Sequence, residues 1–353
     1  MDESLLHDVV ASARAAGADA AEAVFAERQT LSIGVRLGAL EEVEREESRE
    51  LGLRVFIGQS HATVSGSDVS AEGRAKLVSR VMAMARLAPE DAFAGLAPEE
   101  LLARDTGLDL DLYDPVEMEP EALEALARTA EDSARAVKGV SNSEGGSATW
   151  SSGAWRLVTS HGFSGLHRAS SFSVSAAAIA QDEQGMERGG EGRATRWRDD
   201  LPSAEQIGAE AGRRAVQRLG ARKLASQVAP VIFENRSAGA LLSPLIGAIS
   251  GPSVARGVSF LKDKLGQPVF ARGISLVDDP HRVRGLGSSP WDDEGVANAR
   301  RAIIDDGVLT TWLLNTSSAR QLGLQTTGHA SRGLAGPPGV GPSNMTLSTG
   351  DKD

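Results

Sequence analysis

Two regions of the chain alternate apolar and polar residues with a period of two, and this pattern limits the fold more than any other feature. The first region contains the segments "TLSIGVRLG", "LGLRVFIG" and "SHATVSGS", the last two joined by a tight turn. The second region spans 140–200 and divides into short alternating segments separated by Gly or Ser, at 147–152, 154–162, 170–182 and 192–200. Because a period of two places one face of each segment in a core, the chain is predicted to form meanders of antiparallel strands.

Segments with helical periodicity flank these strands, so the fold class is predicted to be α+β, with mixed or antiparallel sheets flanked by helices. The helix predicted within 70–90 turns five residues inward, namely Leu77, Val78, Val81, Met82 and Ala85. A later helix at 203–219 begins with Ser203 and Gln206, the spacing of a capping box. The predicted modules are 1–90, 116–222 and 223–353, with an irregular, Pro- and Asp-rich linker at 91–115 between the first two.

The last third opens on an apolar run, "APVIFE" (229–234), which predicts a strand. A helix of small residues, "ALLSPLIGAISG" (240–251), follows it without a charge, a histidine or a cysteine. A strand that leads into a helix is a common place for a site, yet this helix has no chemically active side chain. Its simplest interpretation is a core helix. Further on, Asp305-Asp306-Gly307 predicts a hairpin, and 316–323 predicts a short capped helix.

Composition excludes several function classes. The net charge of −11, from 37 basic and 48 acidic residues, repels phosphate backbones and argues against nucleic acid as a ligand. The chain has no cysteine, which excludes disulfides and thiolate metal sites. It shows neither a signal peptide nor a membrane-spanning run, so the predicted location is the cytoplasm, without membrane contact. The acidic run from Glu41 to Glu50 is predicted to be a solvated strand edge or loop.

Few side chains offer chemistry by their spacing alone. None of the six histidines forms the three- or four-residue pair typical of a zinc helix. His161 and His167 are interpreted as exposed polar positions of the meander. Asp292 and Asp293, in "DDEG", are explained by turn formation, since Asp and Gly stabilise tight turns. His329 lies in a Gly-rich loop, where a ligand contact is an alternative to a plain loop position.

An ordered series of segments resembles the TldD/PmbA family, and its PmbA branch, also called TldE, more closely. The segments are "RVFIG" (54–58), "APVIFE" (229–234), "LIGAISGPSV" (245–254), "DDEGV" (292–296), the long block 305–330 and "SNMTLSTGD" (343–351). The resemblance runs over nearly the whole chain. It implies a TldD/PmbA-like fold and an intracellular metallopeptidase family, also known as modulators of DNA gyrase, whose members trim or degrade peptides as TldD–TldE heterodimers.

The resemblance also implies a missing metal site. In the TldD branch the helix after the "VIFE"-like strand carries a His-Glu-x-x-x-His zinc motif, and its three functional positions fall here on Ser243, Pro244 and Ala248. TldD-type chains add a late cysteine ligand, which this chain lacks. We therefore expect no catalytic residue, no bound metal and no cofactor in this chain, with the zinc held by a TldD-type partner.

Such a subunit is expected to complete the wall of a chamber for peptides or unfolded protein. The residues predicted to line a substrate groove are Gly247, Asp292, Asp293 and His329. Members of the PmbA branch usually continue beyond the last matching block, so the C-terminal module is expected to be truncated at Asp353. A homodimer is then an alternative assembly for the isolated chain.

Two other functions compete with this one. The first is a metallopeptidase with a different ligand set, for example His161, His167 and His329. The second is a regulatory module that binds a protein linked to gyrase or to a toxin–antitoxin system, as the older family name suggests.

Overall fold

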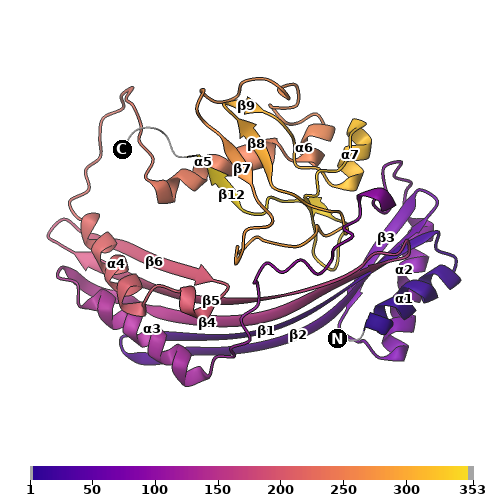
Figure 1. The fold of residues 1–353 in the computed structure, drawn as a ribbon. Helices are drawn as coiled ribbons and strands as arrows, with labels where there is room; N and C mark the ends of the chain where they lie inside the picture. The colour runs from indigo at the N-terminus through magenta and orange to yellow at the C-terminus, as the bar shows by residue number, and fades with distance from the viewer. Residues whose placement is uncertain (1–2, 349–353) are drawn as a thin grey trace.

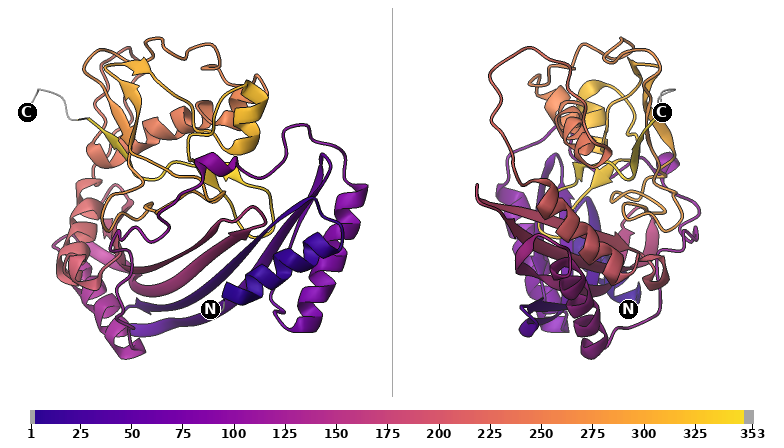
Figure 2. Two further views of the ribbon diagram at one scale, coloured as in Figure 1. Left: turned by 45° about the vertical axis from the view of Figure 1, so that its right-hand side comes forward. Right: turned by 90° about the vertical axis from the view of Figure 1, so that its left-hand side faces the viewer.

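The structure, a computed structural model, describes residues 3–348. Residues 1–2 and 349–353, which include Asp353 and the end of the block 343–351, lie outside the described part. The predicted α+β class with antiparallel sheets is confirmed. A strongly curved sheet forms the lower half of the molecule, and the C-terminal module lies over its concave side (Figures 1 and 2).

The curved sheet has six antiparallel strands in the order β3-β2-β1-β4-β5-β6. The first module supplies β1–β3 and the second supplies β4–β6, so a single sheet runs through both, with β1 paired to β4 at its centre. The strands are β1 (Ala20–Arg36), β2 (Ala39–Ile57), β3 (Ser60–Gly66), β4 (Val140–Thr159), β5 (Ser164–Gln181) and β6 (Met186–Thr195).

The strands of the second module are longer and fewer than the alternation predicted. The segments expected as separate strands at 147–152 and 154–162 form the single strand β4. Gly153, taken as a turn between them, instead stays in register with Arg28 of β1 and Ala169 of β5. The flanking strands therefore keep the backbone extended through a glycine that could have broken it.

Helices cover the other face of the sheet in two pairs. At one end lie α1 (Glu3–Ala15) and α2 (Ala71–Leu87), and at the other α3 (Pro120–Arg135) and α4 (Ala204–Gln217). Alternate residues of β1 serve both cores: Ala23 and Phe25 pack in the first, Leu31 and Ile33 in the second. The five inward residues predicted for α2 are all buried, and the predicted capping box of α4 is present.

The stretch 91–115 and the acidic run both lie beside or within the large sheet. Residues 91–115 are irregular apart from a short 3₁₀ turn at Glu99–Leu101, and they run beside β5, where the Ser170 amide donates to the Leu112 carbonyl at 3.0 Å. The acidic run lies in β2, and this part of the strand pairs only with β1, because β3 begins its pairing at Leu51. The run is therefore a solvated strand at the edge of the sheet.

The C-terminal module contains a four-stranded sheet, β12-β7-β8-β9, and a small two-stranded sheet, β10-β11. Its helices are α5 (Asn235–Ala248), α6 (Gly251–Ala255) and α7 (Thr316–Leu322), and its strands are β7 (Leu276–Asp278), β8 (Arg301–Asp305), β9 (Val308–Leu309), β10 (Ala330–Ser331), β11 (Gly339–Val340) and β12 (Met345–Leu347). The predicted hairpin is β8–β9, and the predicted capped helix is α7, which ends on the left-handed Gly323. No helix within residues 3–348 is long and apolar enough to cross a bilayer.

The predicted strand at 229–234 is wrong. These residues are irregular and exposed, with relative exposures of 72% for Val231 and 95% for Ile232. The apolar run has the composition of a buried strand, but within residues 3–348 it has no neighbouring strand with which to pair. Composition alone cannot hold a strand in place when its main-chain groups have no partner.

The irregular and exposed stretch 221–234, which includes this run, is expected to be the first site of limited proteolysis. Trypsin should cut after Arg222 or Lys223 before it cuts any strand of the large sheet, because cleavage requires accessible backbone without secondary structure. Mass spectrometry of a short digest would locate the first cut. In a variant with Arg222→Gln and Lys223→Gln the early fragments should disappear, and early cuts within β1–β6 would contradict the prediction.

The helix expected at 240–251 also needs correction. It begins earlier, at Asn235, so that Pro244 lies in its third turn, where the Ala240 carbonyl loses its helical donor. Both residues are exposed, and water can take the place of that donor. The interpretation as a core helix holds for one face of α5 only: Leu245 and Ala248 are buried in the apolar core of the C-terminal module, Leu242 and Ile246 pack against that core, and the rest of the helix is largely exposed.

Candidate functional site

The three positions that correspond to the zinc motif offer no metal-binding set. Ser243 and Pro244 are exposed on α5, where serine presents a neutral hydroxyl and proline presents no donor atom. Ala248, one turn on from Pro244, is 6% exposed and packs in the apolar core of the C-terminal module. Zinc needs imidazole, thiolate or carboxylate ligands. The side chains present on α5 therefore do not fit a zinc ion.

The alternative ligand set does not assemble either. Within residues 3–348 no group of three or more His, Asp or Glu side chains is placed to hold a metal ion. His161 is bound between the Ala97 carbonyl, at 2.8 Å from Nε2, and the Thr159 hydroxyl, at 2.6 Å from Nδ1. His167 packs edge-on against Trp291 with ring centroids 5.4 Å apart. The prediction that both histidines are exposed is wrong, since both are half-buried.

The structure brings three of the four predicted groove residues to one place. Asp292, Asp293 and His329 line a cavity of about 130 Å³ in the C-terminal module, whereas Gly247 is exposed on α5 and does not line it. Three stretches of the C-terminal module form most of the cavity wall, namely 291–293, 328–331 and 341–343. A volume of this size holds a few water molecules rather than a peptide side chain of any length.

His329 is held in a buried chain of polar contacts. Its Nε2 lies 3.2 Å from an oxygen of Asp278, and its Nδ1 lies 2.8 Å from the hydroxyl of Thr327. Burial by itself would raise the pKa of Asp278, but hydrogen bonds from His329 and Ser343 outweigh it and lower the pKa. The Thr327 hydroxyl also accepts a hydrogen bond from the Leu314 amide, at 2.8 Å, and lies 3.3 Å from the carbonyl oxygens of Trp312 and Leu314, so this buried group is engaged on all sides by the main chain. Asp278, His329 and Thr327 therefore share the residue types of a catalytic triad, but their contacts are those of a buried structural network.

Asp292 forms the turn that the sequence predicts, but it does so in a buried setting. Its carboxylate accepts hydrogen bonds from the amides of Glu294 and Val296, at 3.0 and 2.9 Å, and from the amide of Ala330, at 3.0 Å. Burial and the nearby charge of Glu294 raise the pKa of Asp292. Burial also raises the pKa of Glu294, whose carboxylate accepts from the amide and hydroxyl of Thr316. These carboxyl groups organise the loop 292–296.

A buried ion cluster joins this loop region to the large sheet. One oxygen of Glu22, on β1, accepts hydrogen bonds from Arg332 at 2.6 Å and from Arg54, on β2, at 3.3 Å. All three side chains are at most 5% exposed. The Arg332 amide in turn donates to Asp293 at 2.9 Å. The cluster thus links the concave side of the sheet to the wall of the small cavity.

The pKa of Asp293 provides a test of this arrangement. Burial raises it to about 6, although the amide and charge of Arg332 act in the opposite direction. Because the folded pKa exceeds the unfolded value, folding favours the protonated carboxyl, and stability falls as the pH rises from about 4 to about 6. Asp293→Asn is therefore expected to raise the free energy of unfolding by about 1–2 kcal/mol at pH 7 and hardly at all at pH 4. Urea unfolding at both pH values would measure it, and an equal effect at both would contradict it.

Sequence reasoning missed Asp278, Glu22, Arg54 and Arg332. Glu22 and Arg54 had a detectable signal, since each is a charged residue within an otherwise apolar strand segment, "AEAVF" and "LRVF". A charge in such a position must be paired when it is buried. For Arg332 the sequence gives no comparable signal, because it lies in a Gly-rich loop 310 positions from its partner.

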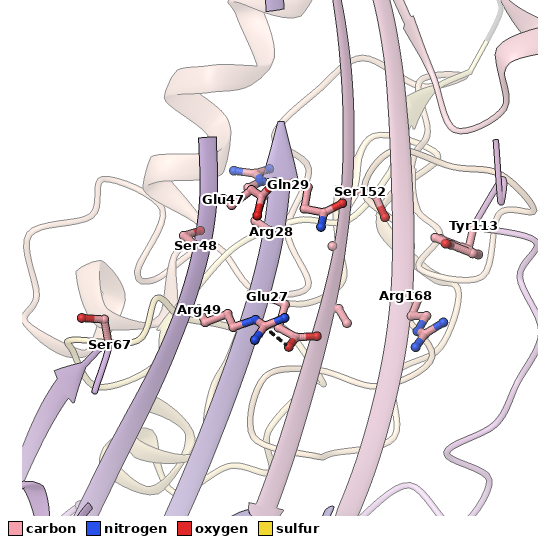
Figure 3. Close-up of a pocket in the computed structure, with 12 residues that line it drawn as sticks. Glu27, Arg28, Gln29, Glu47, Ser48, Arg49, Ser67, Tyr113, Ser152 and Arg168 are labelled. Atoms are coloured by element: carbon pink, nitrogen blue, oxygen red, sulfur yellow. Dashed lines mark ion pairs between the residues drawn. The ribbon is translucent and has the colours of Figure 1, made fainter. Parts of the chain in front are cut away.

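A larger cavity, of about 620 Å³, lies over the middle of β2, β1, β4 and β5 (Figure 3). Glu27 and Arg49 form an ion pair at 3.3 Å across neighbouring strands, with Arg168 and Tyr113 on the far side. The Arg168 guanidinium stands over the Tyr113 ring at 5.8 Å. None of the predicted groove residues lines this cavity. Glu27 and Glu47 are each paired with an arginine, Arg49 and Arg45, and no group of three or more His, Asp or Glu side chains within residues 3–348 is placed to hold a metal ion here.

Comparison with known proteins identifies relatives over most of the chain. Three family models match it: the PmbA/TldA metallopeptidase domain 1 over residues 21–85, the central domain over 113–219 and the C-terminal domain over 226–353. The metalloprotease PmbA of Escherichia coli O157:H7 is 39% identical over 313 residues, which cover 88% of this chain and 69% of the relative. The metalloprotease PmbA homolog of Haemophilus influenzae is 35% identical over 316 residues, which cover 89% and 70%.

Solved structures share the fold at low sequence identity. A protein designated a modulator of DNA gyrase, from Bacteroides thetaiotaomicron, superposes with a TM-score of 0.90 at 23% identity. TldE from Thermococcus kodakarensis superposes with a TM-score of 0.79 at 18% identity. Each match covers 99% of this chain and 78% of the other. At these identities the likeness establishes the fold alone.

Proposed function

The chain belongs to the PmbA/TldD metallopeptidase family, and from this we propose that it is the PmbA/TldE-type subunit of a two-chain metallopeptidase, without a zinc ion of its own. A TldD-type partner would hold the metal, which when bound would activate water for hydrolysis of a peptide bond. The present chain would contribute walls that bind and orient peptide or unfolded-protein substrates. The same proposal places the complex in the cytoplasm.

The observation that supports this proposal most strongly is the surface of α5. A metal-binding helix must present its ligands on one accessible face, and the corresponding residues are a serine, a proline and a buried alanine. Loss at a single position could leave a weakened site. Loss at all three leaves only the Ser243 hydroxyl, and the histidines elsewhere in residues 3–348 are engaged separately.

Reconstitution would test this role. We expect the purified chain to cleave no peptide alone, to form a complex with a TldD-type chain carrying an intact His-Glu-x-x-x-His helix, and to raise that chain's peptidase activity. Native mass spectrometry and a fluorogenic peptide assay would measure the two effects. As a control, changing the first His of the partner's motif to Ala should abolish cleavage while leaving the complex intact. Zinc-dependent cleavage by the isolated chain would contradict the proposal.

A further inference from the structure

Residues 101–114, called the strap below, pass between the C-terminal module and the large sheet (Figure 1). Near the start of the strap, the Ala103 amide donates to the Gly295 carbonyl of the module at 2.9 Å. Near its end, the Leu112 carbonyl accepts a hydrogen bond from the Ser170 amide of β5 at 3.0 Å. The strap therefore ties the module to the sheet through main-chain hydrogen bonds on both sides.

One arginine of the module joins the middle of the strap to the chain that follows β6. The Arg284 guanidinium donates to Asp111 of the strap at 2.6 Å, and to both carboxylate oxygens of Asp200 at 3.0 and 3.1 Å. It also lies 4.3 Å from the centre of the Trp197 ring. The ion-paired side chains are 37–40% exposed, so water and salt ions reach them. These contacts are therefore released more easily than the buried ion pairs of Glu22.

Both partners in the shorter of these ion pairs have a left-handed backbone. The φ angle is +55° at Arg284 and +53° at Asp111, a region that is uncommon for residues other than glycine and especially unfavourable for a long side chain such as arginine. Within residues 3–348 the other non-glycine residues with positive φ are Leu37 and Asp306, which lie in the tight turns of the β1–β2 and β8–β9 hairpins. Arg284 and Asp111 lie in no hairpin turn, and their strained backbones meet through the ion pair itself.

The loop that carries Arg284 also covers a second arginine. The Gly285 and Leu286 carbonyls accept hydrogen bonds from the half-buried Arg196, which lies just after β6. Arg196 in turn donates to the Ser170 carbonyl of β5 at 3.1 Å. Movement of this loop away from the sheet would therefore uncover Arg196 and the backbone of β5 beside it.

We propose that Arg284 is the catch of a reversible, salt-sensitive latch between the C-terminal module and the sheet. When its ion pairs are released, the middle of the strap and the loop 282–288 move away from the end of β6, and the two left-handed residues relax. The buried contacts of Glu22 with Arg332 and Arg54 remain closed and keep the module attached. The latch thus controls access to the sheet at β5 and β6, and it does not depend on the function proposed above.

Hydrogen–deuterium exchange of the full chain, read by mass spectrometry, tests the latch. Salt screens exposed ion pairs, so raising sodium chloride from about 0.05 M to about 0.5 M should speed exchange in peptides covering 107–112 and 282–288 about fivefold. Arg284→Gln should produce the same acceleration at the lower salt concentration and should remove the effect of salt. Peptides from β1, which contains Glu22, should exchange at an unchanged rate in every condition.

Two matched variants separate the latch from general effects of charge. Arg282→Gln removes a cation from the same loop, where its guanidinium contacts the Thr346 hydroxyl and no carboxylate, and it should leave exchange unchanged. Arg284→Asn loses the same ion pairs as Arg284→Gln, but asparagine adopts a left-handed backbone more readily, so its acceleration should be smaller. Thermal unfolding would verify that each variant is folded.

The proposal is overturned by any of three results. These are exchange at 107–112 and 282–288 that responds neither to salt nor to Arg284→Gln, equal acceleration in β1, and an acceleration in Arg284→Asn that matches the one in Arg284→Gln. The salt comparison uses the unaltered chain, so it remains decisive even if a variant does not fold. No partner chain, peptide or zinc is present, so the outcome is independent of reconstitution.

Discussion

Replacing Glu22 with glutamine is expected to lower the free energy of unfolding by about 3–5 kcal/mol at neutral pH. The substitution removes the carboxylate to which the guanidinium groups of both Arg54 and Arg332 donate, and it leaves these two cations buried beside each other without that negative charge. Removal of one partner from a buried ion pair is costly because the remaining charge stays desolvated. Urea unfolding followed by circular dichroism would measure the loss.

The pH dependence distinguishes this effect from simple loss of packing. Burial alone would raise the pKa of Glu22, but the charges of Arg332 and Arg54 lower it below the usual value. A carboxyl with a lowered folded pKa contributes stability above its unfolded pKa and loses it as the pH falls through the folded value. The difference between wild type and Glu22→Gln should therefore shrink in acid. The control Glu27→Gln, in a largely exposed pair with Arg49, should cost at most about 1 kcal/mol, and equal losses would contradict the prediction.

Trp291→Ala is expected to have a comparable effect, a loss of about 3–5 kcal/mol. Trp291 is fully buried between the C-terminal module and the sheet, edge-on to Phe163 at 5.1 Å and to His167 at 5.4 Å. The indole ring fits there because residue 165 is a glycine. Any larger residue at this position would place its Cβ atom 2.7 Å from the ring. Removing the ring leaves a cavity that the two modules cannot readily close.

Denaturant unfolding would measure this loss against two controls. Trp291→Phe should cost less than alanine, because it retains an aromatic ring in the same site. Phe260→Ala removes an aromatic side chain that is 73% exposed and should cost little. If Trp291→Ala lowered the free energy of unfolding no more than Phe260→Ala does, Trp291 would not stabilise the contact between the C-terminal module and the sheet, and the prediction would be wrong.

Periodicity predicted the local elements well, because each depends on neighbouring residues. The five inward residues of α2, the capping box at Ser203 and the β8–β9 hairpin all follow from spacing within a few positions. Pairing between strands that are distant in the sequence cannot be predicted from such local spacing. The alternation in β1 and β4 gives no information that the two strands pair at the centre of a single sheet. For the same reason 229–234 was predicted as a strand, although the described structure provides it with no partner.

The candidate site was only partly predictable. Asp292, Asp293 and His329 were singled out by residue type and by their position in loops, and they share one cavity. Gly247 was inferred because it is a small residue on the helix that corresponds to the zinc helix of the TldD branch, but it lies on the exposed face of α5, away from this cavity. The contacts that hold the cavity in place, from Asp278 to His329 and from Arg332 to Glu22, join residues far apart in the chain. Only the folded arrangement reveals them.

The central claim is that this chain holds no catalytic metal of its own. Its most direct test is the metal content of the purified full chain, measured by inductively coupled plasma mass spectrometry after incubation with zinc and gel filtration. We predict zinc far below one ion per chain, and close to one ion per complex when a TldD-type partner is present. One tightly held zinc ion per isolated chain would contradict the account.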